Sequence, residues 1–163
     1  MARNVFFSFH YANDNWRANQ VRNSWVTKLD KNSAGFIDKA EFEKIKAKGK
    51  QAVKNWIDKQ LIGTSVTVVL IGTETHTRDY VKYELAESNK KGNGILGVYI
   101  HGLKDREGNS SLKGSNSFGE IFINKEGESC YFFELYDTYD WKEDDGYNNI
   151  GEWIERAAKK AGK

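Results

Sequence analysis

An aromatic residue and a carboxylate, Tyr80 and Glu84, stand four residues apart in a segment whose pattern predicts a helix. Residues with this spacing lie on the same face of a helix. A carboxylate fixed beside a ring can stabilise positive charge that develops on a bound ligand. Taken alone, the spacing also suits an ordinary surface pair, because glutamate side chains are mostly exposed.

The elements around this pair give it a position in the fold. The run Val66 to Ile71 is almost entirely β-branched and aliphatic, which is typical of a strand buried on both faces of a parallel sheet. A polar turn follows, and Thr77 is expected to cap a helix that begins at Arg78. Val81 would then face the sheet. The pair should therefore lie near the carboxyl end of a central strand, where ligands bind in open α/β sheets.

A second group of polar and aromatic residues follows the first predicted strand, Asn4 to Phe9. It combines rings, amides and one guanidinium in a loop and the start of a helix, with Asn13 or Asp14 as the expected cap. If the two strands are neighbours, this loop lies beside the Tyr80 and Glu84 pair. The alternative is that Tyr11 and Trp16 simply cover the core.

The rest of the chain alternates between the two kinds of element. Further strands are predicted at 21–26, 94–100 and 130–135, helices at 39–46, 50–61 and from 150, and polar loops at 29–38 and 102–128. This alternation predicts a single α/β domain over residues 1–163, a three-layer sandwich with a mainly parallel sheet flanked by helices. The strand order is expected to be flavodoxin-like, 2-1-3-4-5, which places the loops after strands one and three around one crevice.

The composition of the chain bears on its partners and its location in the cell. The 163 residues include 25 basic and 23 acidic ones, a net charge of +2, which does not favour a nucleic-acid or membrane surface as partner. No apolar run approaches the ~20 residues that cross a bilayer. There is one cysteine, Cys130, and the first residues do not resemble a secretory signal. The expected location is the cytoplasm.

Several common kinds of site are not supported. The glycine-rich signatures of dinucleotide and triphosphate cradles are absent. The three histidines, His10, His76 and His101, match no zinc spacing, so no metal is expected. Cys130 opens a predicted strand, which favours burial over a role as nucleophile.

Four segments together resemble a known family. Val5 to Tyr11, Arg22 to Val26, Thr64 to Gly72 and Arg78 to Glu84 are similar to the TIR-like domain of the Thoeris anti-phage defence system, the ThsB family. The resemblance implies a TIR-type fold and an enzyme that consumes NAD+ on phage infection. It also implies that the product is a cyclic ADP-ribose isomer that switches on a partner effector, ThsA.

The resemblance also implies roles for individual residues. TIR enzymes carry their catalytic glutamate in Trp-x-x-x-Glu on the helix after the third strand, and this motif maps onto Tyr80 to Glu84, with tyrosine in place of tryptophan. The equivalent of the BB loop, about 26–38, has no proline, which leaves its closure and its part in self-assembly open. Glu84 is then the catalytic residue and NAD+ is a substrate, with no cofactor. The residues expected to bind substrate are Ser8, Phe9, His10, Tyr11, Asp38 and Tyr80.

So sparse a site is chemically sufficient. Nicotinamide leaves NAD+ as a neutral molecule, so one carboxylate that stabilises the oxocarbenium-like ribose can be enough. If water is excluded, a hydroxyl of the same molecule's adenosine can close the ring. Two alternatives remain: a plain NAD+ hydrolase that makes linear ADP-ribose, and a TIR-like module that signals by assembly without catalysis.

Overall fold

A parallel sheet organises the protein. The computed structural model describes residues 3–26, 31–34, 39–117, 121–123, 127–131 and 136–163. Within them one five-stranded sheet has the order β2-β1-β3-β4-β7, and all four of its pairings are parallel. Its strands are β1 (Arg3–Ser8), β2 (Lys31–Ala34), β3 (Val66–Ile71), β4 (Gly94–Tyr99) and β7 (Thr138–Asp140). The predicted flavodoxin-like α/β fold is confirmed.

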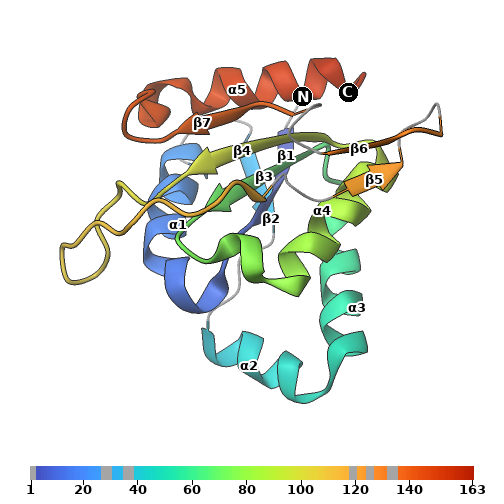
Figure 1. The fold of residues 1–163 in the computed structure, drawn as a ribbon, viewed down its shortest axis with the longest axis horizontal. Helices are drawn as coiled ribbons and strands as arrows, with labels where there is room; N and C mark the ends of the chain where they lie inside the picture. Colours follow the sequence, from blue (N-terminus) through green and yellow to red (C-terminus); the bar gives the residue numbers. More distant parts are fainter. Residues whose placement is uncertain (1–2, 27–30, 35–38, 118–120, 124–126, 132–135) are drawn as a thin grey trace.

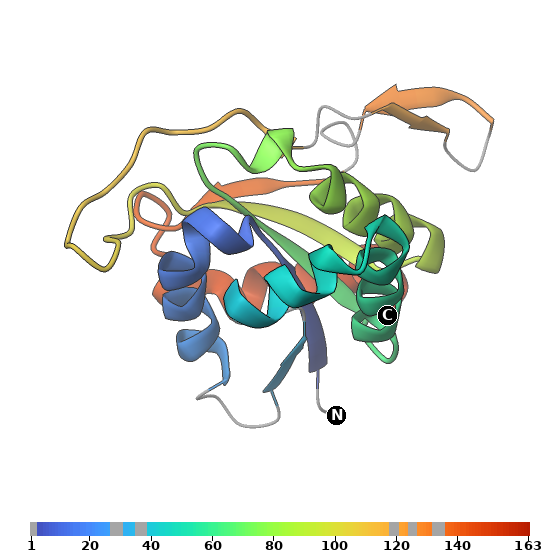
Figure 2. The same cartoon turned by 90° about the horizontal axis from the view of Figure 1, so that it is seen from below.

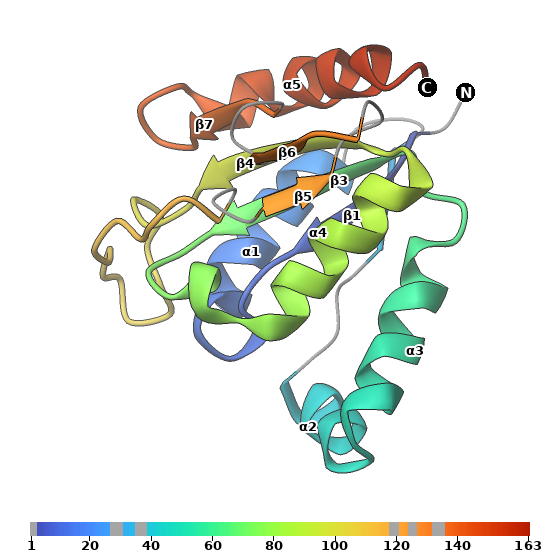
Figure 3. The ribbon, with the colours of Figure 1, turned by 45° about the vertical axis from the view of Figure 1, so that its right-hand side comes forward.

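The central strand β3 is buried on both faces, as its aliphatic run predicted. Val66, Val68 and Leu70 join the core cluster shared with α1 (Tyr11–Val26) and α5 (Gly146–Lys160). Val69 and Ile71 pack against α4 (Asp79–Lys91) on the other face. Alternate side chains of one strand thus separate the two helical layers. Figures 1 and 3 show α5 along one face of the sheet and α4 along the other.

Two further helices lie between β2 and β3 in the chain. The helix α3 (Lys50–Leu61) packs Ile57 and Leu61 around Phe6. The short helix α2 (Lys39–Ala47) places Phe42 in the main core cluster, beside Tyr11. Seen from below in Figure 2, α2 and α3 cross in front of the sheet. The predicted helices at 39–46 and 50–61 and the predicted amphipathic helix from residue 150 are confirmed. No helix in the described residues is long and apolar enough to span a membrane.

The strand predicted at 21–26 is wrong, because these residues are the last turns of α1. Ala18, Val21 and Trp25 are all fully buried and recur at the helical spacing of three and four residues. The helix also begins earlier than expected, at Tyr11, so neither Asn13 nor Asp14 is its cap.

The loop predicted at 29–38 is only partly correct. Residues 31–34 form β2, whose polar sequence gives no strand signal and which is held by its pairing with β1. Residues 29–30 and 35–38, including Asp38, lie outside the described residues.

The start of α4 also differs from the prediction. A 3-10 turn, η1 (Thr75–Thr77), precedes it, and Arg78 rather than Thr77 is the N-cap residue. The Thr77 hydroxyl instead donates to the Glu74 carbonyl.

The strand predicted at 130–135 does not join the main sheet. Residues 129–131 form β6 (Ser129–Tyr131), which pairs antiparallel with β5 (Ile121–Ile123) in a separate hairpin, and 132–135 lie outside the described residues. The loop predicted at 102–128 is therefore only partly correct, because it contains β5. The hairpin lies at the periphery in Figure 2. The fifth place in the sheet belongs to β7, because strand composition does not specify the partner.

Candidate active site

Glu84 lies in the middle of α4 and has no exposed surface. Its Oε1 accepts a 3.3 Å hydrogen bond from the Tyr11 hydroxyl at the first turn of α1. The reading of Tyr80 and Glu84 as an ordinary surface pair is therefore wrong. The carboxyl group faces the interior at the carboxyl end of β1.

Aromatic rings pack around Tyr11, the donor of this hydrogen bond. Tyr11 and Tyr80 stack with their centroids 5.3 Å apart and their planes 20° apart, and the Tyr11 backbone N–H donates to the Tyr80 hydroxyl at 3.1 Å. Phe42, from α2, lies with its centroid 4.3 Å from Tyr11 and 5.3 Å from Tyr80. Trp56 of α3 meets the Tyr11 ring edge-on at 5.7 Å. Tyr11, Tyr80, Phe42 and Trp56 thus form a ring cluster that holds the donor to Glu84 in place.

Burial controls the protonation of this carboxyl. It raises the pKa of Glu84 from 4.5 to about 8, because a charged carboxylate loses its hydration there, while the nearby Ser8 and Tyr11 hydroxyls act to lower it. Burial, followed by the charge of Glu84, raises the pKa of Tyr11 well above its usual value. Within the described residues, Oε2 of Glu84 has no hydrogen-bond partner. In this closed site, where Glu84 is fully buried, its carboxyl group is mostly neutral at pH 7, and Oε2 can accept a hydrogen bond from a ligand.

The structure brings most of the predicted site residues to one edge of the sheet. Ser8 and Phe9 are fully buried and His10 is 5% exposed. The Phe9 ring meets Tyr11 edge-on at 4.6 Å and belongs to the main core, so it supports Tyr11 from within. Burial, with a smaller contribution from Arg78, lowers the pKa of His10. Asp38 lies outside the described residues, so the structure does not place it.

Phe42 was not anticipated from the sequence. It is the one aromatic residue of the short polar helix α2, and it is only 3% exposed. A lone ring in an otherwise charged helix marks the face that packs inward, and this signal could have identified it. Trp16, by contrast, is 54% exposed and does not cover the core.

A buried ion pair was also missed. Asp14 and Arg17, one turn apart on α1, are 2% and 6% exposed, with Oδ1 3.6 Å from Nη1. Burial raises the pKa of Asp14 to about 6, and Arg17 opposes the shift. The Arg17 guanidinium also donates to the carbonyls of Leu103 and Asn109, at 2.9 and 3.0 Å. The pair therefore fastens the long polar segment after β4 to α1.

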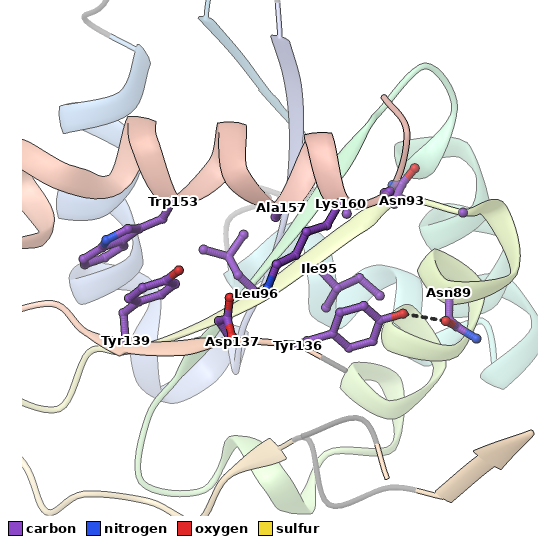
Figure 4. Close-up of a pocket in the computed structure, with 13 residues that line it drawn as sticks. Asn89, Asn93, Ile95, Leu96, Tyr136, Asp137, Tyr139, Trp153, Ala157 and Lys160 are labelled. Carbon is purple, nitrogen blue, oxygen red and sulfur yellow. Dashed lines mark hydrogen bonds and ion pairs between the residues drawn. The ribbon is translucent and has the colours of Figure 1, made fainter. Parts of the chain in front are cut away.

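A groove of about 440 Å³ adjoins the ring cluster, between α2, α3 and α4. Phe42 and Tyr80 line it, whereas Glu84 does not. A cavity of about 300 Å³ opens elsewhere, near the amino end of β4, where Tyr136 donates to Asn89 and Tyr139 stacks on Trp153 (Figure 4). That cavity is at the opposite edge of the sheet from Glu84.

No group of three or more histidine, cysteine, aspartate or glutamate side chains in the described part of the chain is arranged to hold a metal ion.

Comparison with known proteins identifies the family. A family model described as the TIR-like domain of the Thoeris protein ThsB matches residues 6–105, which include Tyr11, Tyr80 and Glu84. This chain belongs to the ThsB TIR-like family. A ThsB relative from Bacillus cereus (strain MSX-D12), named "Putative cyclic ADP-D-ribose synthase ThsB1", is 36% identical over 94% of this chain and 100% of its own length. The ThsB model thus spans from within β1 to the end of β4, the part of the fold that contains Tyr11, Phe42, Tyr80 and Glu84.

Proposed function

We propose that this protein is an NAD+-cleaving cyclase that releases nicotinamide and makes a cyclic ADP-ribose isomer, with Glu84 as its essential carboxylate. Family membership and the name of the Bacillus cereus relative support the activity. The observation that carries the residue assignment is the buried Glu84 carboxyl, hydrogen-bonded by Tyr11 at the carboxyl edge of the sheet. The signal would act on the Thoeris effector ThsA.

The bond that breaks joins C1′ of the nicotinamide ribose to the pyridinium nitrogen. The bonding electron pair goes to that nitrogen, so nicotinamide leaves neutral and positive charge develops on the ribose. Glu84, ionised, stabilises that charge. A hydroxyl oxygen of the adenosine half then bonds to C1′ and passes its proton to the Glu84 carboxylate or to water, which closes the ring. If water attacks instead, the product is linear ADP-ribose.

The substrate itself favours the active protonation state. A carboxyl with a pKa of about 8 is mostly neutral at pH 7, but a cation placed beside it lowers that pKa. The pyridinium ring of NAD+ carries such a charge. Binding of NAD+ and ionisation of Glu84 are therefore coupled, whereas the closed site holds the carboxyl neutral.

Access to Glu84 requires the ring cluster to open. Tyr80 and Phe42 line the groove and contact Tyr11, so displacement of these rings would connect the groove to the carboxyl. The predicted role of Ser8, Phe9, His10 and Tyr11 is to position the dinucleotide. The loop near Asp38 is proposed to exclude water.

The experiment is incubation of the purified protein with NAD+, with and without extract of infected cells, followed by mass analysis of the products. Loss of nicotinamide alone from the substrate mass supports the cyclase, and loss of nicotinamide with gain of water indicates a plain hydrolase. Glu84→Gln keeps the side-chain shape and removes the charge, and is expected to abolish nicotinamide release. Unchanged release by this variant overturns the role of Glu84, and no product from wild-type protein in any condition favours a non-catalytic module.

A further inference from the structure

We propose that the groove between α2, α3 and α4 binds the adenylate half of the dinucleotide, an aromatic base joined to a 5′-phosphate. The inference rests on the proposed function for the identity of the whole substrate. The site itself is argued from the groove's lining, its charge and its position beside Tyr80.

The floor of the groove is apolar and aromatic. Phe42, Val53, Ile57, Tyr80 and Tyr83 line it, and its volume of about 440 Å³ falls in the range of small-molecule sites. The Tyr83 ring is held in place by a 2.8 Å hydrogen bond from its hydroxyl to Asp58. Fixed rings of this kind suit a flat aromatic base.

The rim of the groove is basic. Lys46, Lys50 and Lys54 line it, against one carboxylate, Asp79. Lys54 places its ammonium 5.3 Å from the centre of the Tyr83 ring, and Lys46 lies 5.8 Å from that of Phe42. Three ammonium groups around an aromatic floor complement a ligand that is aromatic at one end and anionic at the other.

Tyr80 lies between the groove and the residue that binds the buried carboxyl. Tyr80 lines the groove, and it stacks on Tyr11, the ring that donates to Glu84. Tyr80 and Glu84 are one helical turn apart, about 6 Å along the axis. A pyrophosphate link bridges such a gap, so one dinucleotide can place its adenylate in the groove and its other ribose at Glu84.

Direct binding tests the groove without relying on turnover. Adenosine 5′-monophosphate, adenosine and inorganic phosphate are titrated by calorimetry into full-length Glu84→Gln protein, with and without the pair Lys50→Gln and Lys54→Gln. The control carries Lys44→Gln on α2 and Lys59→Gln on α3, which remove the same amount of charge from positions that do not line the groove.

The lysine pair in the groove is expected to weaken binding of the monophosphate by about tenfold or more, while the control stays within about twofold. Adenosine binding should be similar in all three proteins, since it carries no phosphate. With Glu84 present, the groove pair should raise KM for NAD+ more than it lowers kcat. Circular dichroism confirms that each variant is folded.

The outcomes separate the two proposals. Monophosphate binding that does not depend on the groove lysines, or no binding at millimolar concentration, overturns the groove assignment even if NAD+ is cleaved. Lysine-dependent binding in a protein that never cleaves NAD+ supports the groove and overturns the proposed activity.

Discussion

The Tyr11 hydroxyl donates to Glu84 Oε1 across 3.3 Å, and this contact joins the first turn of α1 to the middle of α4. It links the two helices that follow the neighbouring strands β1 and β3. The same tyrosine stacks on Tyr80 and packs against Phe42. Tyr11 is thus the residue through which the carboxyl, the ring cluster and the groove are connected.

Removing the Tyr11 hydroxyl tests that connection. Tyr11→Phe is expected to lower the free energy of unfolding by about 1 kcal/mol or more, because a buried carboxyl oxygen loses its donor. It should also raise the pKa of Glu84 further, since the hydroxyl acts to lower it. Urea denaturation and the pH dependence of nicotinamide release measure the two effects. An unchanged pH dependence contradicts the link to Glu84.

The pH dependence of catalysis follows from the state of Glu84. If the ionised form is active, kcat/KM for NAD+ should rise about tenfold per pH unit up to about pH 8 and then level off, because this ratio reports the free enzyme. kcat should level off at lower pH, since bound pyridinium favours the carboxylate. Initial rates are measured from about pH 5.5 to about pH 9, an interval that brackets the Glu84 pKa of about 8. A kcat/KM that falls over this interval indicates that the neutral acid is the active form.

Glu84 should also make the fold less stable as the pH rises. Its pKa is raised from 4.5 to about 8, so the folded protein keeps a proton that the unfolded chain loses between these values. Stability is therefore highest below about pH 4.5 with respect to this group and falls as the pH approaches 8, by up to about 1.4 kcal/mol per unit. Glu84→Gln lacks this effect.

Urea denaturation at pH 5 and pH 8 checks this expectation. The stability of Glu84→Gln relative to wild type should increase between the two pH values. Glu87→Gln changes a partly exposed glutamate on the same helix and serves as the control. A relative stability of Glu84→Gln that is the same at both pH values contradicts the assigned shift.

The Asp14 and Arg17 pair should hold the segment after β4 in place. Arg17→Met removes two hydrogen bonds to the carbonyls of Leu103 and Asn109 and leaves the Asp14 carboxylate buried without its cation. The expected cost is about 3 kcal/mol, with faster amide exchange in residues 103–111. Arg106→Met, on the exposed part of that segment, is the control. Equal exchange in the two variants would show that Arg17 does not anchor it.

Gly72 lies where the turn after β3 meets Asp14. A Cβ at this position would overlap the Asp14 carboxyl group. Gly72→Ala is therefore expected to destabilise the fold by about 1–3 kcal/mol. The cost should fall when Asp14→Ala is already present, because the overlapping group is gone. A double-mutant cycle measured by urea denaturation gives the coupling, and strict additivity would contradict the steric explanation.

The main elements of the fold could be predicted from local patterns. The aliphatic run at Val66 to Ile71 predicts β3 at its observed bounds. The helices predicted over 39–46 and 50–61 lie at 39–47 and 50–61. Where the prediction was wrong, pairing between strands decided the structure. The polar strand β2 is held by its pairing with β1, and the strand at 129–131 pairs with β5 in a hairpin. Val21 to Val26 also differs from its predicted strand, because Ala18, Val21 and Trp25 are buried at helical spacing and the segment continues α1.

The sequence by itself determined the parallel α/β class and the spacing that sets Tyr80 and Glu84 on one turn of a helix, because both follow from periodicity along the chain. Only the tertiary structure decided that Glu84 points inward, that Tyr11 donates to it, and that Phe42 and three lysines of α2 and α3 line a groove with Tyr80. These relationships join residues far apart in sequence, and the environment that raises the pKa of Glu84 exists only once those segments pack together.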